Sequence, residues 1–164
     1  MVTWGEFEIA AGPLATVARE RFEGAGLVLV GTLRRRGWPR ISPVEPLLLD
    51  GRLYLGMMWR SMKALDLERD PRCVVHSVVS SNDGAQGDVK VYGRAEAITD
   101  ADERVRYGEG LYARIGWRPP GDFHLFAVDI EEVGYFRVEG TMHRVWHWRP
   151  GEVLGELERR PGSA

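Results

Sequence analysis

The feature that most constrains the fold is a run of three consecutive strand signals within residues 26–58. Each segment is apolar or alternates apolar with polar residues, and each junction carries glycine in a turn-forming context. Connections this short join antiparallel neighbours, because parallel strands need a crossover of a dozen or more residues. The strands are expected at 27–35, 40–49 and 52–58, with turns at 36–39 and 50–51.

The rest of the chain adds further strands and a few helices. Four more strands are expected, at 73–79, 89–98, 123–138 (broken or bulged near Gly134) and 142–149. Helices are expected at 13–23, 61–69 and 101–114. Because the strands do not alternate regularly with helices, a doubly wound parallel sheet is not expected. The sequence predicts a mainly β, α+β fold, an antiparallel barrel or sandwich with short flanking helices.

Length and charge limit the organisation and the partners of the chain. A sequence of 164 residues predicts one domain, placed at 1–150, with a polar C-terminal tail at 151–164. A net charge of −2 implies no strong attraction to nucleic acid or to an anionic membrane. The run Arg34-Arg35-Arg36 is therefore interpreted as a solvated hairpin tip rather than a nucleic-acid site.

The single cysteine and the N-terminal residues bear on the cellular compartment. Cys73 excludes an intrachain disulfide, and its apolar surroundings, CVVHSVV, predict a buried structural thiol rather than a nucleophile. The first ten residues contain two glutamates and lack the basic region of a secretory signal. No apolar run approaches the ~20 residues that span a bilayer, so a cytoplasmic protein is expected.

The stretch WRSMKALDLERDPR, residues 59–72, places two cations where a helix is expected to begin. Ser61 is a suitable N-cap, but Arg60 and Lys63 oppose the positive end of the helix dipole. Acidic side chains come only later, at Asp66 and Glu68. Free amides, a hydroxyl and cations together suit a phosphate, so the stretch indicates either ordinary capping or an anion site. Neither a Walker-type loop nor a dinucleotide fingerprint is present.

The same stretch belongs to an ordered set of short motifs. R-x-x-P-V stands at 40–44, followed by Asp50-Gly51, S-x-K-A-x-x-L-x-x-D-P-R at 61–72 and V-x-G-x-A at 91–95. Over about residues 26–100, and more weakly to 149, the chain resembles the flavin-binding split-barrel family related to pyridoxamine 5'-phosphate oxidases. The resemblance implies a six-stranded antiparallel split β-barrel with flanking short helices.

The resemblance also implies a cofactor and a partner, namely FMN in a groove between the two subunits of a homodimer. The FMN phosphate is expected at Arg40, Ser61 and Lys63, and backbone at 42–44 and 57–59 is expected to flank the isoalloxazine ring. The implied cofactor-binding residues are Arg40, Ile41, Ser42, Pro43, Val44, Met57, Met58, Trp59, Arg60, Ser61 and Lys63. The implied function is an FMN-dependent oxidoreductase acting on an unidentified small molecule.

Two alternatives stay open beside this function. One is a deazaflavin-dependent reductase, and the other is a non-catalytic protein that binds flavin or haem. No catalytic acid–base pair stands out, which is compatible with an enzyme whose flavin supplies the chemistry. The chain departs from the family at Met62, where a basic residue is usual, and at Asp88, where a glutamine is frequent. The segment HRVWHWR at 143–149 also lacks the second arginine of the oxidases' substrate motif, which argues against pyridoxamine phosphate as the substrate.

Four residues of that segment have no assigned role. His143 and His147 lie on a predicted strand, where four residues span about 13 Å, too far to share one metal ion. No metal site is therefore predicted. Trp146 and Trp148 fall on the opposite face, and packing at a subunit interface is favoured over contact with a cofactor ring.

Overall fold

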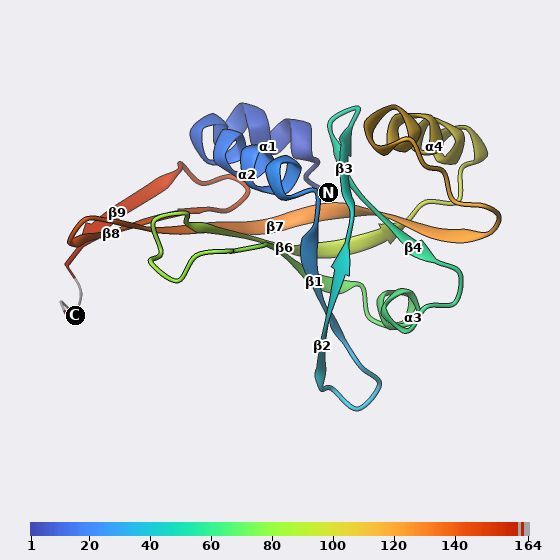
Figure 1. Ribbon diagram of the computed structural model, residues 1–164, viewed down its shortest axis with the longest axis horizontal. Helices are drawn as coiled ribbons and strands as arrows, with labels where there is room; N and C mark the ends of the chain where they lie inside the picture. Colours follow the sequence, from blue (N-terminus) through green and yellow to red (C-terminus); the bar gives the residue numbers. More distant parts are fainter. Residues whose placement is uncertain (161, 163–164) are drawn as a thin grey trace.

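The computed structural model describes residues 1–160 and 162 and contains four helices and nine strands. The helices are α1 (Trp4–Ala10), α2 (Gly12–Ala25), α3 (Met62–Arg69) and α4 (Ala101–Ile115). The strands are β1 (Val28–Leu33), β2 (Pro39–Val44), β3 (Pro46–Leu49), β4 (Arg52–Met58), β5 (Arg72–Ser77), β6 (Asp88–Ala97), β7 (Phe123–Glu139), β8 (Met142–Trp148) and β9 (Gly155–Arg159). Figure 1 shows α1 and α2 side by side, α4 beyond β3, and the β8–β9 hairpin extending away from them.

The strands form a barrel that is closed by one bent segment. Their order is β2-β1-β5-β6-β7-β4-β3, and every pairing in this path is antiparallel. Strands β2 and β3 stand at opposite ends of the order, yet only Glu45 separates them in the chain. Counted as one strand, they bring the path to six members and close it. The fold is therefore the antiparallel split barrel of the α+β class. The split of the barrel denotes here the bend at Glu45, where the closing strand changes its pairing partner from β1 to β4.

The bend at Glu45 corrects the prediction of one strand over 40–49. The first half pairs with β1, with Val44 opposite Val28, whereas the second half pairs with β4, with Pro46 opposite Leu55. A proline lacks the N–H that a ladder needs, and proline flanks Val44-Glu45 on each side, at Pro43 and Pro46. The chain therefore changes partner between these two prolines.

Two other expectations need adjustment. The irregularity expected near Gly134 lies at Glu131, where the register between β6 and β7 shifts by one residue, while Gly134 itself is paired. The segment 151–164, expected as a polar tail, contains β9, which pairs with β8. Of that segment, residues 161, 163 and 164 lie outside the described part of the chain.

Helix α1 was not predicted, and it packs against α2 and against strands β4 and β7. A capping box starts it, because the Thr3 hydroxyl accepts from the Glu6 amide and the Glu6 carboxylate accepts from the Thr3 amide. The fully buried Phe7 ring lies 5.1 Å from the ring of Trp148. Trp148 thus belongs to the core of this chain, which corrects its expected place at a subunit interface.

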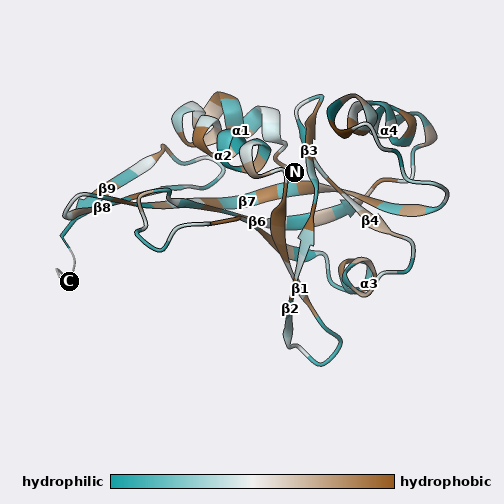
Figure 2. Cartoon of the chain, in the orientation of Figure 1, coloured by the Kyte–Doolittle hydropathy of each residue, from teal (hydrophilic) through white to brown (hydrophobic). Residues whose placement is uncertain are grey.

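The barrel interior follows the alternation of β residues. Along β6, Val89, Val91, Gly93 and Ala95 point inward while their neighbours are exposed or half-buried. Cys73 lies in this core, as expected, and burial raises the pKa of its thiol to about 12. Figure 2 shows β1 as almost uniformly hydrophobic, whereas α4 mixes hydrophobic and hydrophilic residues, as expected for a helix with one covered side. In the described part of the chain, no helix is long and apolar enough to cross a membrane.

Candidate functional site

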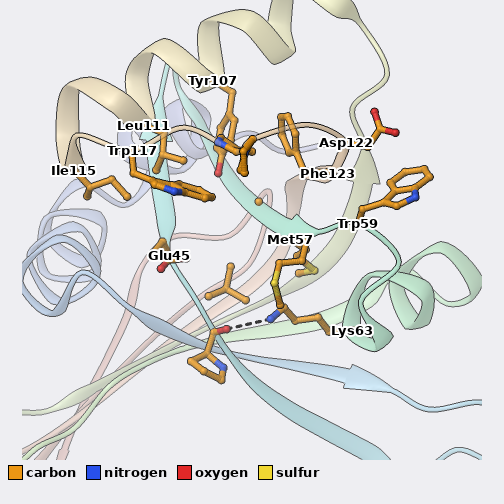
Figure 3. A pocket seen from close by; sticks show the side chains of 16 residues that line it. Glu45, Met57, Trp59, Lys63, Tyr107, Leu111, Ile115, Trp117, Asp122 and Phe123 are labelled. Atoms are coloured by element: carbon orange, nitrogen blue, oxygen red, sulfur yellow. Dashed lines mark hydrogen bonds between the residues drawn. The ribbon is translucent and has the colours of Figure 1, made fainter.

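A pocket of about 610 Å³ opens where the barrel is split. Its volume falls within the range of roughly 300–1,000 Å³ typical of small-molecule sites. The bent strand supplies Pro43, Val44 and Glu45, and β4 with its following turn supplies the segment 56–59. Helix α4 and the loop after it form the opposite wall (Figure 3). The bend that closes the barrel therefore also creates the pocket.

Six of the predicted cofactor-binding residues line this pocket. They are Pro43, Val44, Met57, Met58, Trp59 and Lys63. The Lys63 ammonium donates to the Pro43 carbonyl oxygen at 3.4 Å, which ties the start of α3 to β2 across the pocket floor (Figure 3). The sequence motifs thus identify one side of the pocket, the side made by two strands and the helix start.

The opposite wall was missed by the sequence reasoning. Tyr107, Leu111 and Ile115 face the pocket at i, i+4 and i+8 of α4, and Trp117 and Phe123 extend the wall. The helical spacing was visible in the sequence as an apolar stripe. The surface that this stripe covers depends on how α4 packs beside β3 and β4. The sequence pattern of the helix alone does not encode that packing.

Tyr107 is the most constrained side chain of this wall. Its hydroxyl points into the pocket and lies against Gly56, where an added Cβ would come within 2.1 Å of the oxygen (Figure 3). Burial raises the pKa of Tyr107 to about 12, and the nearby Glu45 carboxylate adds to this effect. Tyr107 therefore remains a neutral hydrogen-bond donor at physiological pH.

The start of α3 has the properties expected of an anion site. Ser61 has the extended backbone of an N-cap, but its hydroxyl makes no capping hydrogen bond. The Ser61 Oγ atom is buried and has no hydrogen-bond partner among the described residues. The first amides of a helix likewise have no intrahelical acceptor. A hydroxyl and backbone donors are thus left without protein partners two residues from Lys63, which counts against the simple capping interpretation.

Arg40 lies on a different hollow from Lys63. Its Nε donates to the buried Asp66 carboxylate at 2.7 Å, and that carboxylate also accepts from Arg69 and Thr32. Burial acts to raise the pKa of the Asp66 carboxyl, but these donors outweigh it, so the pKa lies below the usual range. The hollow, of about 580 Å³, is lined by Arg40, Arg69, the arginines 34–36, Trp38, Met62, Leu65 and Asp66.

His124, left without a role by the sequence, braces the turn between β4 and α3. Its Nε2 accepts the Arg60 amide at 3.0 Å, and its Nδ1 lies 3.1 Å from a Glu68 carboxylate oxygen. Because an amide can only donate, the neutral ring carries its proton on Nδ1, directed at Glu68. The ring also stacks on Trp59 at 4.6 Å. Arg60, held at φ 56°, is thereby fixed in a left-handed conformation unusual for arginine.

The remaining predicted residues lie beside the pocket rather than on it. Ile41 is exposed and Ser42 half-buried on β2, Arg60 donates its backbone amide to His124, and Ser61 directly precedes α3. Within residues 1–160 and 162, no group of three or more histidine, cysteine, aspartate or glutamate side chains is arranged to hold a metal ion. His143 packs edge-on against Phe136, and His147 lies against Gly155.

The closed antiparallel path, with β2 and β3 as the two halves of one bent strand, defines the class of split-barrel proteins. A family model described as pyridoxamine 5'-phosphate oxidase matches residues 14–137, and the chain belongs to this family. The resemblance found in the sequence motifs is thereby confirmed. No curated protein matches the chain.

Solved structures share the fold at low sequence identity. A pyridoxamine 5'-phosphate oxidase-related, FMN-binding protein from Nostoc punctiforme is 15% identical, with a TM-score of 0.67 over 92% of this chain and 96% of that one. A heme-binding protein from Mycobacterium smegmatis is 20% identical, with a TM-score of 0.63. The match covers 81% of this chain but only 57% of the Mycobacterium smegmatis protein. PhzG from Burkholderia lata, in complex with tetrahydrophenazine-1-carboxylic acid, is 13% identical, with a TM-score of 0.62 over 96% and 93%.

Proposed function

We propose that the chain binds FMN in the pocket at the barrel split and acts as an oxidoreductase on a small molecule. The observation that carries this proposal is the buried, unpartnered Ser61 hydroxyl at the start of α3, two residues before Lys63, which lines the apolar pocket. A phosphate satisfies the hydroxyl and the first-turn amides, and it offsets the Lys63 charge. Family membership and the fold shared with an FMN-binding protein support the same cofactor.

The residues that line the pocket suit the two ends of such a cofactor. Ser61 and Lys63 take the phosphate, whereas Arg40 is held by Asp66 on the second hollow. Backbone at 42–44 and 57–59 borders the ring, next to the stacked Trp59 and His124. Bound there, FMN supplies hydride or electron transfer, while the protein positions it and limits access of water.

The Lys63 phosphate contact gives the first prediction. Replacing Lys63 with alanine should weaken FMN binding about 10- to 100-fold, because a charge-assisted hydrogen bond contributes about 1.5–3 kcal/mol. Titration of FMN fluorescence measures this affinity. Ser61→Ala should weaken binding less, since it removes a neutral donor. Arg106→Ala, which removes an exposed cation of α4 outside the pocket, is the matched control.

Unchanged FMN affinity in Lys63→Ala would remove this residue from the site. The absorption spectrum of the purified protein, with mass spectrometry of the released ligand, then separates FMN from the two alternatives. A deazaflavin coenzyme keeps the ring site and changes the mass. Haem, suggested by the fold of the Mycobacterium smegmatis protein, needs an axial ligand, and His124 is already bound on both nitrogens. Flavin reduction that couples to no acceptor would favour a carrier or sensor.

We further propose that the protein works as a cytoplasmic homodimer with the cofactor between subunits. Large apolar side chains stand exposed along β2 and the β4–α3 turn, a pattern typical of interface cores. They are Trp38, Ile41, Met58, Trp59 and Met62. A single free cysteine fits a compartment in which thiols stay reduced.

The dimer gives the second prediction. Sedimentation equilibrium should give twice the chain mass of 18.5 kDa. Ile41→Glu should shift the protein to monomers, because an interface carboxylate loses hydration without gaining a partner. Ile9→Glu is the matched control, since Ile9 is 89% exposed on α1, away from the proposed interface. A wild-type monomer at micromolar concentration would contradict the proposal.

A further inference from the structure

The charges of the pocket are unequally distributed. Among the described lining residues, the charged side chains are Lys63, Glu45 and Asp122. Lys63 is held toward Pro43 at the α3 end, where the proposed phosphate lies. The part of the pocket left for a substrate therefore carries two carboxylates and no cation among those lining residues.

Glu45 lines the pocket, where its carboxylate can contact a bound ligand. It is the single residue between β2 and β3, and it is exposed where the barrel splits. Its carboxylate is close enough to the Tyr107 hydroxyl to contribute to the raised pKa of that group. The Glu45 carboxylate is an acceptor and the Tyr107 hydroxyl a donor, and both residues line the same pocket.

The remaining wall is apolar and uncovered. Trp117 and Ile115 are 51% and 48% exposed although they line the pocket, and Phe123 continues the surface they form. Arg104 stacks on Phe123 at 4.2 Å, but its guanidinium donates to the carbonyl oxygens of Ile98 and Phe123. This cation is thus bound behind the wall. Flat apolar surface of this kind binds rings, and it gives no compensation for an anionic substituent.

We propose that the substrate of this pocket is a planar, apolar ring compound that is neutral or cationic, with an N–H donor directed at Glu45. The corresponding carboxylate or phosphate is disfavoured, because Glu45 and Asp122 repel an anion and no lining cation on their side of the pocket offsets them. The inference rests on the proposed function, since it assigns the Lys63 end of the pocket to the cofactor. It also distinguishes this chain from a split-barrel protein that binds a tricyclic carboxylic acid.

Two matched probes test the proposal, phenazine-1-carboxamide and phenazine-1-carboxylate. They share the same ring system, and the substituent on it is neutral in the first and anionic in the second. Quenching of tryptophan fluorescence in the FMN-loaded protein measures both affinities at pH 7.5. The carboxamide should bind about 10-fold more tightly than the carboxylate. Glu45→Gln should reduce this ratio to about 2-fold or less, and Glu45→Lys should invert it. Glu109→Gln, on the exposed side of α4, should leave the ratio unchanged.

The outcomes separate this inference from the proposed function. A wild-type protein that binds FMN yet binds both probes equally, or neither, overturns the inference and leaves the function standing. A protein that does not bind FMN overturns the proposed function, and the same pair is then titrated into the FMN-free protein. Discrimination that disappears in Glu45→Gln supports the role of Glu45 there, and discrimination that persists overturns it. Circular dichroism confirms that each variant is folded.

Discussion

Replacing Asp66 with alanine should lower the free energy of unfolding by about 3 kcal/mol, measured by urea denaturation. The carboxylate is 2% exposed and accepts hydrogen bonds from Thr32, Arg40 and Arg69. Removing it leaves a partly buried guanidinium without its counter-charge, which typically costs 3–5 kcal/mol. The lower end applies because the Arg40 side chain is 25% exposed and keeps contact with water.

Asp66→Asn and Glu109→Ala complete this experiment. The asparagine keeps the shape of the side chain but removes its charge, so its effect should be intermediate. Glu109 is exposed on α4, and its removal should leave the stability within about 0.5 kcal/mol of wild type. Equal stability of wild type and Asp66→Ala would show that the three donors are satisfied by water instead.

The pKa of Asp66 predicts how this difference depends on pH. Since the folded-state pKa lies below the usual range, the carboxylate stabilises the fold above its unfolded pKa of about 3.9. That stabilisation is lost as the pH falls through the folded-state pKa. The stability gap between wild type and Asp66→Asn should therefore be constant near neutrality and should narrow below about pH 4.

Replacing Gly56 with alanine should cost about 1–3 kcal/mol of stability and abolish ligand binding in the pocket. An added Cβ would lie 2.1 Å from the Tyr107 hydroxyl oxygen and 2.9 Å from its Cζ. Tyr107 is 2% exposed and packs against Tyr54 and Phe123, so it cannot move without disturbing the wall. Denaturation curves and FMN titration measure the two effects.

A double-mutant cycle identifies the contact responsible. Tyr107→Phe removes the hydroxyl, so in the Gly56→Ala background it should restore about 1 kcal/mol, with the Cζ contact preventing full recovery. Gly134→Ala is the matched control, because no atom lies within 4 Å of a Cβ added at that strand position. Strictly additive effects of the two substitutions would contradict the proposed contact.

The parts of the fold that the sequence predicted are those set by local chemistry. Asp50-Gly51 fixed the β3–β4 turn, and Asp70-Pro71 ended α3 as expected. The partner change at Glu45 could not be read locally, because it depends on β1 and β4, which lie on opposite sides of the bend. Helix α1 was missed although the Thr3–Glu6 capping box was present, since its short length gives little periodicity.

The residues of the candidate site also fall into two groups, those indicated by local motifs and those placed by contacts distant in sequence. The motifs indicated the pocket side that contains Met57 and Lys63, because a family pattern records those positions. Tyr107 and His124 were missed because each acts through a contact distant in sequence, with Gly56 and with Arg60. The family resemblance and the expected strand pairing grouped Arg40 with Lys63, whereas the Arg40 side chain is bound by Asp66 on a second hollow.

The left-handed backbone at Arg60 has a consequence for ligand affinity. Such a conformation costs a non-glycine residue about 1–2 kcal/mol, and here the amide held by His124 maintains it. That cost is met when the chain folds, so the turn leading into Ser61 is preorganised before any ligand arrives. Binding then need not order the turn, and more of each contact's free energy remains as affinity.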